Sequence, residues 1–226
     1  FADLDELCHY LQHFYSLHPT LPLSHTCVRT AVDLALWDLA GHIWQQPAAV
    51  LLQQASGRTT ALASRLCYSG TYGASNAREL QQYQQAYQAL KLGVFKLKVG
   101  VNLAAELQLL RQLQQAHPGA RWRVDANGAW DLATAYQAIE QFSTLGIESV
   151  EQPLPAHDKQ SYVTLMRDCH AQMPIVLDES FCQWSDVQYF LDAGVTPALN
   201  LRVSKCGGLW SSLAYANAAS AAGLWY

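Results

Sequence analysis

Residues 94–100 read VFKLKVG, a short apolar run that ends in glycine and carries two lysines two positions apart. In an extended chain successive side chains point to opposite faces, so Val94, Lys96 and Lys98 share one face. The residues between them line the other face, which is entirely apolar. Such a strand either presents its lysines to solvent or opens a polar site on its inner face.

Similar apolar runs recur along the chain and alternate with stretches in which apolar residues have helical spacing. The candidate strands are residues 61–70, 94–100, 121–128, 147–154, 175–180 and 198–205. The candidate helices are residues 76–92, 103–116, 131–145, 158–171, 185–193 and 208–222. Because strands and helices alternate without hairpin signals, the sequence predicts an α/β fold with a parallel sheet.

Charged residues recur at the end of five consecutive candidate strands. They follow one another at intervals of 27, 26, 27 and 27 residues and are Lys98, Asp125, Glu151, Asp178 and Lys205. A period this close to one strand and one helix is typical of a (β/α) barrel, in which the carboxyl ends of the strands meet at one mouth. The alternative is unrelated surface charges near loops. Their repetition at one place in five units favours a shared site.

The three acids of this set predict a metal site. Asp125, Glu151 and Asp178 would come from adjacent strands, and converging carboxylates repel one another unless a cation lies among them. Hard oxygen ligands without cysteine or histidine favour Mg²⁺, for which Mn²⁺ could substitute.

The two lysines of the set flank the acids in strand order and predict proton transfer. A nearby metal and a second ammonium group disfavour the charged form, so we expect the pKa of Lys98 to be lowered. A neutral lysine beside a divalent ion suits the removal of a proton α to a carboxylate, with the metal stabilising the enediolate that forms.

Five motifs together give the chain a specific resemblance to a known family. They are KLK at 96–98, DANGAW at 125–130, EQPL at 151–154, DES at 178–180 and SKCGG at 204–208. In this order they resemble the enolase superfamily, in its muconate lactonizing enzyme subgroup (mandelate racemase/muconate lactonizing enzyme-like proteins). The superfamily pairs a lysine or histidine base with Mg²⁺.

The resemblance implies roles for individual residues. Lys98 and Lys205 would be the two acid/base groups, and Lys96 would tune Lys98 and help to neutralise the intermediate. Asn127 and Glu179 would support the metal shell, and a structural hydrogen-bonding role is the equal alternative for each.

The resemblance also implies a division of the chain. Residues 24–47, SHTCVRTAVDLALWDLAGHIWQQP, resemble the helix that leads from the family's capping domain into its barrel, and LLQQASGR at 51–58 replaces the usual glycine motif. Residues 1–57 would then be the C-terminal part of the capping domain with the connecting helix. Residues 58–226 would be a (β/α) TIM-type barrel that contains strands 1–6 and the start of strand 7. We therefore interpret the chain as a portion of a longer polypeptide, poorly soluble or inactive by itself.

The motifs favour an isomerase that acts on a small-molecule carboxylate. This would be an epimerase or racemase that uses both lysines, or a cycloisomerase that needs one. A dehydratase of the o-succinylbenzoate synthase type is the close alternative. A glycosidase that uses two of the carboxylates explains neither the lysines nor the third acid. A non-catalytic fragment is the alternative from another class.

The composition limits the kinds of partner and the cellular location that we expect for the protein. Hydrophobic residues make up 50% of the 226 residues and charged residues 14%, which predicts a large buried core. The net charge of −4 argues against a nucleic-acid partner. No apolar run approaches the ~20 residues that span a membrane, and no signal peptide is seen. Six cysteines without a CxxC pair predict reduced thiols, so we expect a cytoplasmic protein, homo-oligomeric at full length.

Overall fold

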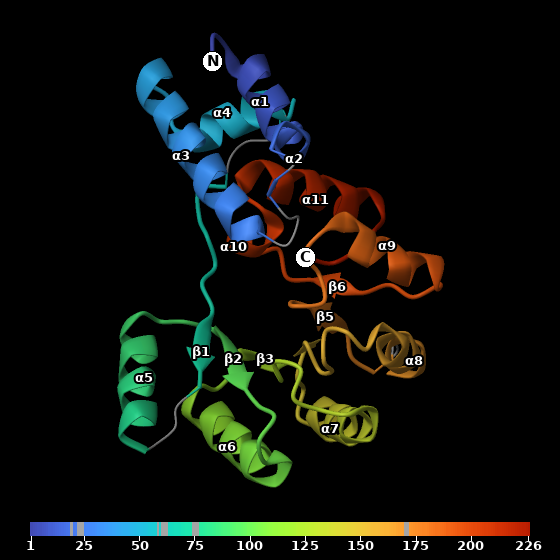
Figure 1. Ribbon diagram of the computed structural model, residues 1–226. Helices are drawn as coiled ribbons and strands as arrows, with labels where there is room; N and C mark the ends of the chain where they lie inside the picture. The colour runs from blue at the N-terminus through green and yellow to red at the C-terminus, as the bar shows by residue number, and fades with distance from the viewer. Residues whose placement is uncertain (19, 22–24, 58, 60–62, 74–76, 170–171) are drawn as a thin grey trace. The chain divides into compact units, whose positions relative to one another are not determined.

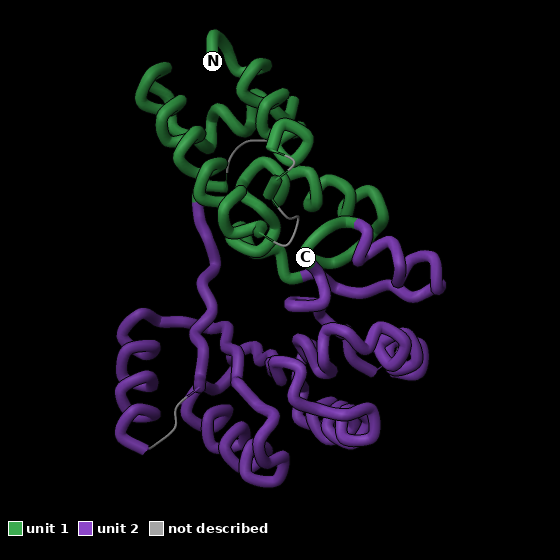
Figure 2. Tube along the Cα trace, viewed as in Figure 1, with its two compact units in different colours: residues 1–64, 182–184, 200–226 green, residues 65–181, 185–199 purple. Residues whose placement is uncertain are grey.

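The computed structural model describes residues 1–226 apart from residues 19, 22–24, 58, 60–62, 74–76 and 170–171 (Figure 1). The chain divides into two compact units (Figure 2). The first comprises residues 1–64, 182–184 and 200–226, and the second comprises residues 65–181 and 185–199. Of the helices in the described part of the chain, none has both the length and the hydropathy of a membrane span.

A parallel sheet runs through the second unit, and its six strands lie in sequence order (Figure 1). They are β1 (Gly70–Tyr72), β2 (Val94–Lys98), β3 (Arg121–Asp125), β4 (Val150–Glu151), β5 (Ile175–Leu177) and β6 (Ala198–Leu199). Each strand pairs in parallel with the next. The predicted α/β fold class with a parallel sheet is confirmed.

A helix follows each of the first five strands. These helices are α5 (Ala77–Ala89), α6 (Leu103–Ala116), α7 (Leu132–Thr144), α8 (Lys159–Cys169) and α9 (Trp184–Asp192). The bounds of α6 are those predicted, and the other four differ from prediction by at most 3 residues at either end. Because each strand runs parallel to the next, the carboxyl ends of the strands share one edge of the sheet.

The first strand is shorter than the sequence predicts. Of the predicted residues 61–70, residues 61 and 62 lie outside the described residues, and residues 63–69 form no strand. Gly70 pairs with Phe95, the second residue of β2. Almost all of the predicted strand therefore precedes the start of β2, its parallel neighbour in the described part of the chain, so it has no ladder to join there.

The apolar face of β2 is buried, as the alternation in VFKLKVG predicts. Phe95 and Leu97 are inaccessible to solvent. Phe95 packs against Trp122 of β3 and Tyr72 of β1, with ring centroids 4.9 and 5.6 Å apart. His117 joins this aromatic cluster, and its Nε2 lies 2.6 Å from Tyr72 Oη. The lysines of β2 lie on the opposite face.

Three helix ends show how the local sequence relates to the bounds of the helices. Asp131 caps α7, because its side chain accepts a hydrogen bond from Thr134 N at 2.8 Å. α9 begins at Trp184, so Ser185 lies inside the helix and not at its N-cap. After α5 the chain turns at Lys91, which has a left-handed backbone with φ 53°.

The first unit is helical. Its helices are α1 (Leu4–Gln12), α2 (Phe14–Leu17), α3 (Thr26–Trp44), α4 (Ala48–Ala55), α10 (Val203–Cys206) and α11 (Leu209–Ala221). Its buried cluster is formed by Leu7, Leu11, Trp37, Ala40 and Leu51. The division into a capping domain and a barrel at residue 57 stays a prediction.

Candidate active site

Strand pairing places three predicted site residues in one row across the sheet. Lys98 of β2 is the register partner of Asp125 of β3, and Asp125 is the partner of Glu151 of β4. Each is the last residue of its strand, so the row lies at the carboxyl edge, where (β/α) folds carry their chemistry. The next member of the row is Val176, and Asp178 lies two residues further along the chain, directly after β5.

Lysine ammonium groups contact two of these acids. Lys96 Nζ lies 2.9 Å from Asp125 Oδ2 and 3.0 Å from Glu151 Oε2. Lys98 Nζ lies 2.6 Å from the same Oδ2 atom. Because side chains two residues apart on a strand share a face, the KLK motif delivers both lysines to the acids. The inner face of β2 therefore opens a polar site.

The charged groups of the site differ in how far their side chains are buried. The Asp125 side chain is 1% exposed, whereas the Lys98 side chain is 38% exposed. Burial opposes ionisation of Asp125, but hydrogen bonds from Lys98 and Lys96 outweigh it and hold the Asp125 pKa below its usual value. Burial likewise disfavours the charged form of Lys96, and its contacts with Asp125 and Glu151 nevertheless raise its pKa. Lys96 is thus held in its charged form, and Lys98 is the more exposed of the two lysines.

Asn127 lies between Lys98 and two acids. Its backbone nitrogen donates to Asp125 Oδ1 at 3.0 Å, and its Oδ1 accepts from Lys98 Nζ at 2.6 Å. Its Nδ2 lies 3.5 Å from Oε1 of Glu179, an exposed residue. Asn127 has φ 47°, a left-handed conformation that asparagine tolerates better than most residues. Asn127 therefore makes hydrogen bonds within the site, and its support of a metal shell stays a prediction.

Gln152 is a site residue to which the sequence motifs gave no role. Its side chain is buried, and its Oε1 accepts from the backbone nitrogens of Asp178 at 3.0 Å and Ser180 at 3.2 Å. Its Nε2 donates to Ser180 Oγ at 2.7 Å. Gln152 ties the loop after β4 to the loop that carries Asp178. The available signal was a polar residue directly after Glu151, since a buried amide must find partners.

Lys205 does not end a strand, and that prediction is wrong. β6 ends at Leu199, and Lys205 lies in α10 of the first unit. Leu199 pairs with Leu177, the last residue of β5, so beyond Leu199 the chain has passed the end of β5. It turns into a short helix instead. Within this unit Lys205 Nζ donates to Asn200 O at 2.9 Å.

The donor chemistry of the three acids fits Mg²⁺. Asp125, Glu151 and Asp178 are buried carboxylates at the ends of consecutive strands, and such oxygens are the ligands that Mg²⁺ prefers. Within the described ranges, no group of three or more His, Cys, Asp or Glu is arranged to hold a metal ion. At Asp125 the lysine nitrogens supply the compensating positive charge.

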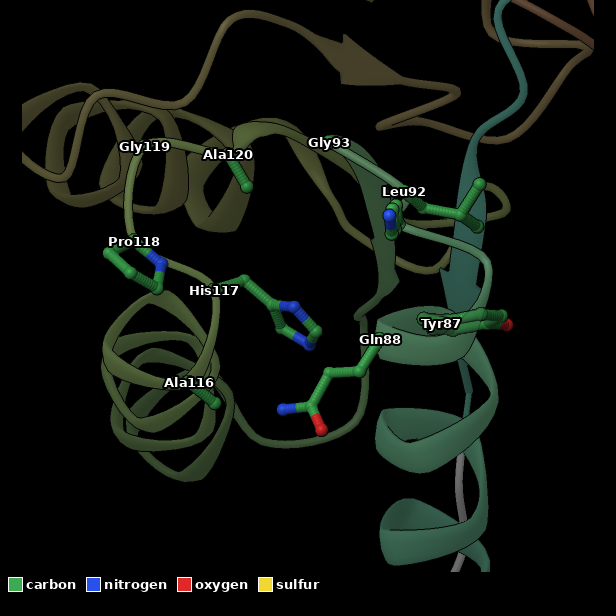
Figure 3. A pocket seen from close by; sticks show the side chains of 10 residues that line it. Tyr87, Gln88, Leu92, Gly93, Ala116, His117, Pro118, Gly119 and Ala120 are labelled. Carbon is green, nitrogen blue, oxygen red and sulfur yellow. The ribbon is translucent and has the colours of Figure 1, made fainter.

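A pocket of about 290 Å³ opens at a different place in the second unit (Figure 3). It is lined by residues 87–88, 91–93 and 116–120. His117 and Gln88 extend into it from opposite sides (Figure 3). Its lining residues precede the first residues of β2 and β3, so the pocket lies at the opposite end of these strands from Lys98 and Asp125. None of the predicted site residues lines it.

A parallel α/β fold with acids and lysines at its carboxyl edge matches a known family. Residues 76–226 match the family model described as "Enolase C-terminal domain-like". This is more than half of the chain, and the chain belongs to that family.

Named relatives agree with this assignment. The chain is 29% identical over 190 residues to the hydrophobic dipeptide epimerase of Enterococcus faecalis. The matched stretch covers 82% of this chain and 50% of the relative. It is 39% identical over 125 residues to the o-succinylbenzoate synthase of Thermosynechococcus vestitus. This match covers 53% of this chain and 38% of the relative. The chain spans about half the length or less of these two relatives.

A solved structure shows the same fold. Muconate lactonizing enzyme from Klebsiella pneumoniae matches with a TM-score of 0.80 at 28% identity, over 96% of this chain and 59% of that chain. The expected resemblance to the enolase superfamily is confirmed, and the relatives of this chain are enzymes.

Proposed function

We propose that the full-length protein is an isomerase of the muconate lactonizing enzyme subgroup that removes a proton α to the carboxylate of a small molecule. The observation that carries this proposal is the row of Lys98, Asp125 and Glu151, with Lys96 bridging the two acids. A reachable lysine beside buried acids suits proton transfer next to a group that gains negative charge. The names of the relatives, a dipeptide epimerase and a muconate lactonizing enzyme, support an epimerase or a cycloisomerase.

The proposed proton transfer uses two lysines. Lys98, as a free amine, takes the proton from the α-carbon, and the electron pair of that bond moves toward the substrate carboxylate. Lys205, as an ammonium group, returns a proton to the other face, which inverts the centre. Lys96 keeps its positive charge and offsets the negative charge that develops.

Before it acts as a base, Lys98 must give up its ion pair with Asp125. Asn127 Oδ1 holds the same nitrogen at 2.6 Å and keeps it near the site. Asp125, Glu151 and Asp178 are the proposed ligands of Mg²⁺, which would supply, when bound, the positive charge that stabilises the substrate carboxylate as it gains electrons.

A dehydratase of the o-succinylbenzoate synthase type is the second candidate. It is favoured by one observation, the 39% identity to a relative with that name. Its reaction would begin with the same proton abstraction, but water would then leave, and the second lysine would act mainly through its charge.

Exchange of the α-proton with solvent deuterium tests the proposal. The full-length protein is incubated in D₂O and Mg²⁺ with dipeptides, N-acyl amino acids and related carboxylates, and the α-proton signal is followed by NMR. We expect the signal of one class to disappear and EDTA to prevent this. Lys91→Ala, at an exposed lysine that precedes the start of β2 whereas Lys98 ends that strand, is the matched control and should keep full exchange.

Two other outcomes are informative. Loss of water from the substrate would identify the dehydratase instead of the isomerase. If no carboxylate exchanges with or without metal, the proton-abstraction proposal is wrong.

A further inference from the structure

Asp33 of α3 is a buried acid that the proposed chemistry does not use. It is 0% exposed, and its Oδ1 accepts from Leu209 N at 2.6 Å while Oδ2 accepts from Trp210 N at 3.3 Å. These nitrogens begin α11, where backbone donors have no partner inside the helix. Asp33 therefore caps α11 from a position 176 residues earlier in the sequence.

Two glycines connect α10 to α11 and lie against α3. Gly207 and Gly208 have φ 84° and 111°, in the left-handed region that favours glycine. A Cβ atom on Gly208 would overlap the Asp33 carboxyl group, and one on Gly207 would lie 3.2 Å from Arg29 Cδ. The close approach of α3 thus explains both glycines of the SKCGG motif.

Thr30, almost one turn before Asp33, contacts the other side of the same segment. Its buried hydroxyl oxygen lies 3.2 Å from Val203 O and 3.1 Å from Ser204 O, and 2.8 Å from Thr26 O within its own helix. Residues three apart share a helix face, so one face of α3 contacts the chain immediately before and shortly after Lys205.

Lys205 stands between these contacts. It lies in a helix of 4 residues, too short to hold its position by its own hydrogen bonds. We infer that Asp33, together with Thr30, is a positioning residue for Lys205: α3 holds the segment from Val203 to Trp210 in place, and with it the lysine. The inference rests on the proposed function, which gives Lys205 a part in proton transfer.

The substitution Asp33→Asn in the full-length protein tests this. The amide has the shape of the carboxyl group but lacks its charge and one of its two acceptor atoms. Lys205→Ala should slow exchange from one epimer of the substrate about 100- to 10,000-fold. We expect Asp33→Asn to slow exchange from that same epimer about 10- to 100-fold, the effect of a misplaced catalytic group, and to spare the other epimer.

Three further variants sharpen the test. Asp38→Asn makes the same chemical change on the same helix, at a side chain that is 78% exposed, and should alter neither epimer. Gly208→Ala would place a Cβ atom against the Asp33 carboxyl group and so disturb the same contact from the α11 side. It should slow exchange from the same epimer as Asp33→Asn. If circular dichroism shows that Asp33→Asn does not fold, Thr30→Val applies the same test at the other contact.

The outcomes separate the inference from the proposed function. Equal slowing of both epimers in a folded Asp33→Asn protein would show a general structural role and overturn the inference, as would unchanged exchange from both. If Lys205→Ala itself leaves both epimers unaffected, the role of Lys205 in the proposed function fails, and the inference fails with it.

Discussion

Lys98 and Lys205 differ in their surroundings, although the motifs treat them as a pair. Lys98 contacts Asp125 and Asn127, whereas Lys205 donates to a backbone carbonyl in the other compact unit. If each lysine serves one face of the α-carbon, the loss of either affects one stereoisomer. The epimerase proposal therefore depends on these two residues acting separately.

For Lys98→Ala and Lys205→Ala we expect opposite stereochemical defects. Each should slow α-proton exchange from one stereoisomer about 100- to 10,000-fold, the usual contribution of a general base. Both should leave Mg²⁺ binding unchanged. Exchange rates of the separate D and L substrates in D₂O measure this. Equal and mild effects of the two variants on both isomers would instead indicate surface charges without a catalytic role.

The residue types at the site could be predicted, and their contacts could not. The recurrence of charge at strand ends identified the members of the row. It did not reveal that Lys96 and Lys98 contact Asp125 directly, because spacing gives the face of a side chain but not its partner. Gln152 was missed for the same reason, since its partners lie on the following β–α loop.

At the scale of elements, Gln152 connects the loops that follow β4 and β5. Gln152→Leu would remove the side-chain amide and leave the nitrogens of Asp178 and Ser180 without their acceptor. A buried polar group that loses its partner costs about 1–3 kcal/mol, so we expect the free energy of unfolding to fall by that amount. Urea denaturation measures it. Gln160→Leu, at an exposed position of α8, should have little effect, and an equal loss in both variants would argue against the connection.

The aromatic cluster at the other end of β2 predicts a dependence of stability on pH. Burial lowers the pKa of His117, whose Nε2 is hydrogen-bonded to the Tyr72 hydroxyl. The unfolded state, with a pKa near 6.5, therefore binds more protons than the folded state as the pH falls. The stabilisation is complete above pH 6.5 and is lost as the pH falls through the lower, folded-state value.

Thermal melts between pH 7.5 and pH 5 measure this contribution. We expect His117→Gln to reduce the slope of melting temperature against pH, and His157→Gln, at an exposed histidine, to leave it unchanged. A slope that is the same in wild type and His117→Gln would show that other groups cause the pH dependence.

Helices were easier to predict than strand lengths. The spacing of apolar residues on α6 is a property of its own sequence, so its bounds could be read directly. The ends of β1 and β6 depend on where the neighbouring strand begins or ends. For the same reason Lys205 was assigned to a strand, because the sequence does not show that β5 has already ended at Leu177.

At the scale of the whole molecule, contacts distant in sequence decide which segments group together. Residues 200–226 form a compact unit with residues 1–64, and Thr30 and Asp33 make hydrogen bonds across 173 to 177 positions. Alternation of strands and helices predicts the order of the sheet. It contains no information about such pairings, so this grouping could not be predicted.

Metal binding should stabilise the whole protein, since a ligand that binds only the folded state shifts unfolding by mass action. At a Mg²⁺ concentration 100 times its Kd we expect the free energy of unfolding of the full-length protein to rise by about 2.7 kcal/mol. Differential scanning calorimetry at constant ionic strength measures the accompanying rise in Tm. Asp125→Asn, Glu151→Gln and Asp178→Asn should each reduce the rise, and Asp192→Asn, at an exposed acid, should not. The same rise in all variants would mean that the metal binds elsewhere.

The most direct test of the account is a crystal structure of the full-length protein with Mg²⁺ and a substrate carboxylate. We expect that structure to show a cation bound by oxygens of Asp125, Glu151 and Asp178. Lys98 Nζ should be released from Asp125 and directed at the α-carbon. A substrate bound in the pocket beside His117, with Lys98 Nζ still on Asp125 Oδ2 and no cation among the three acids, would contradict it.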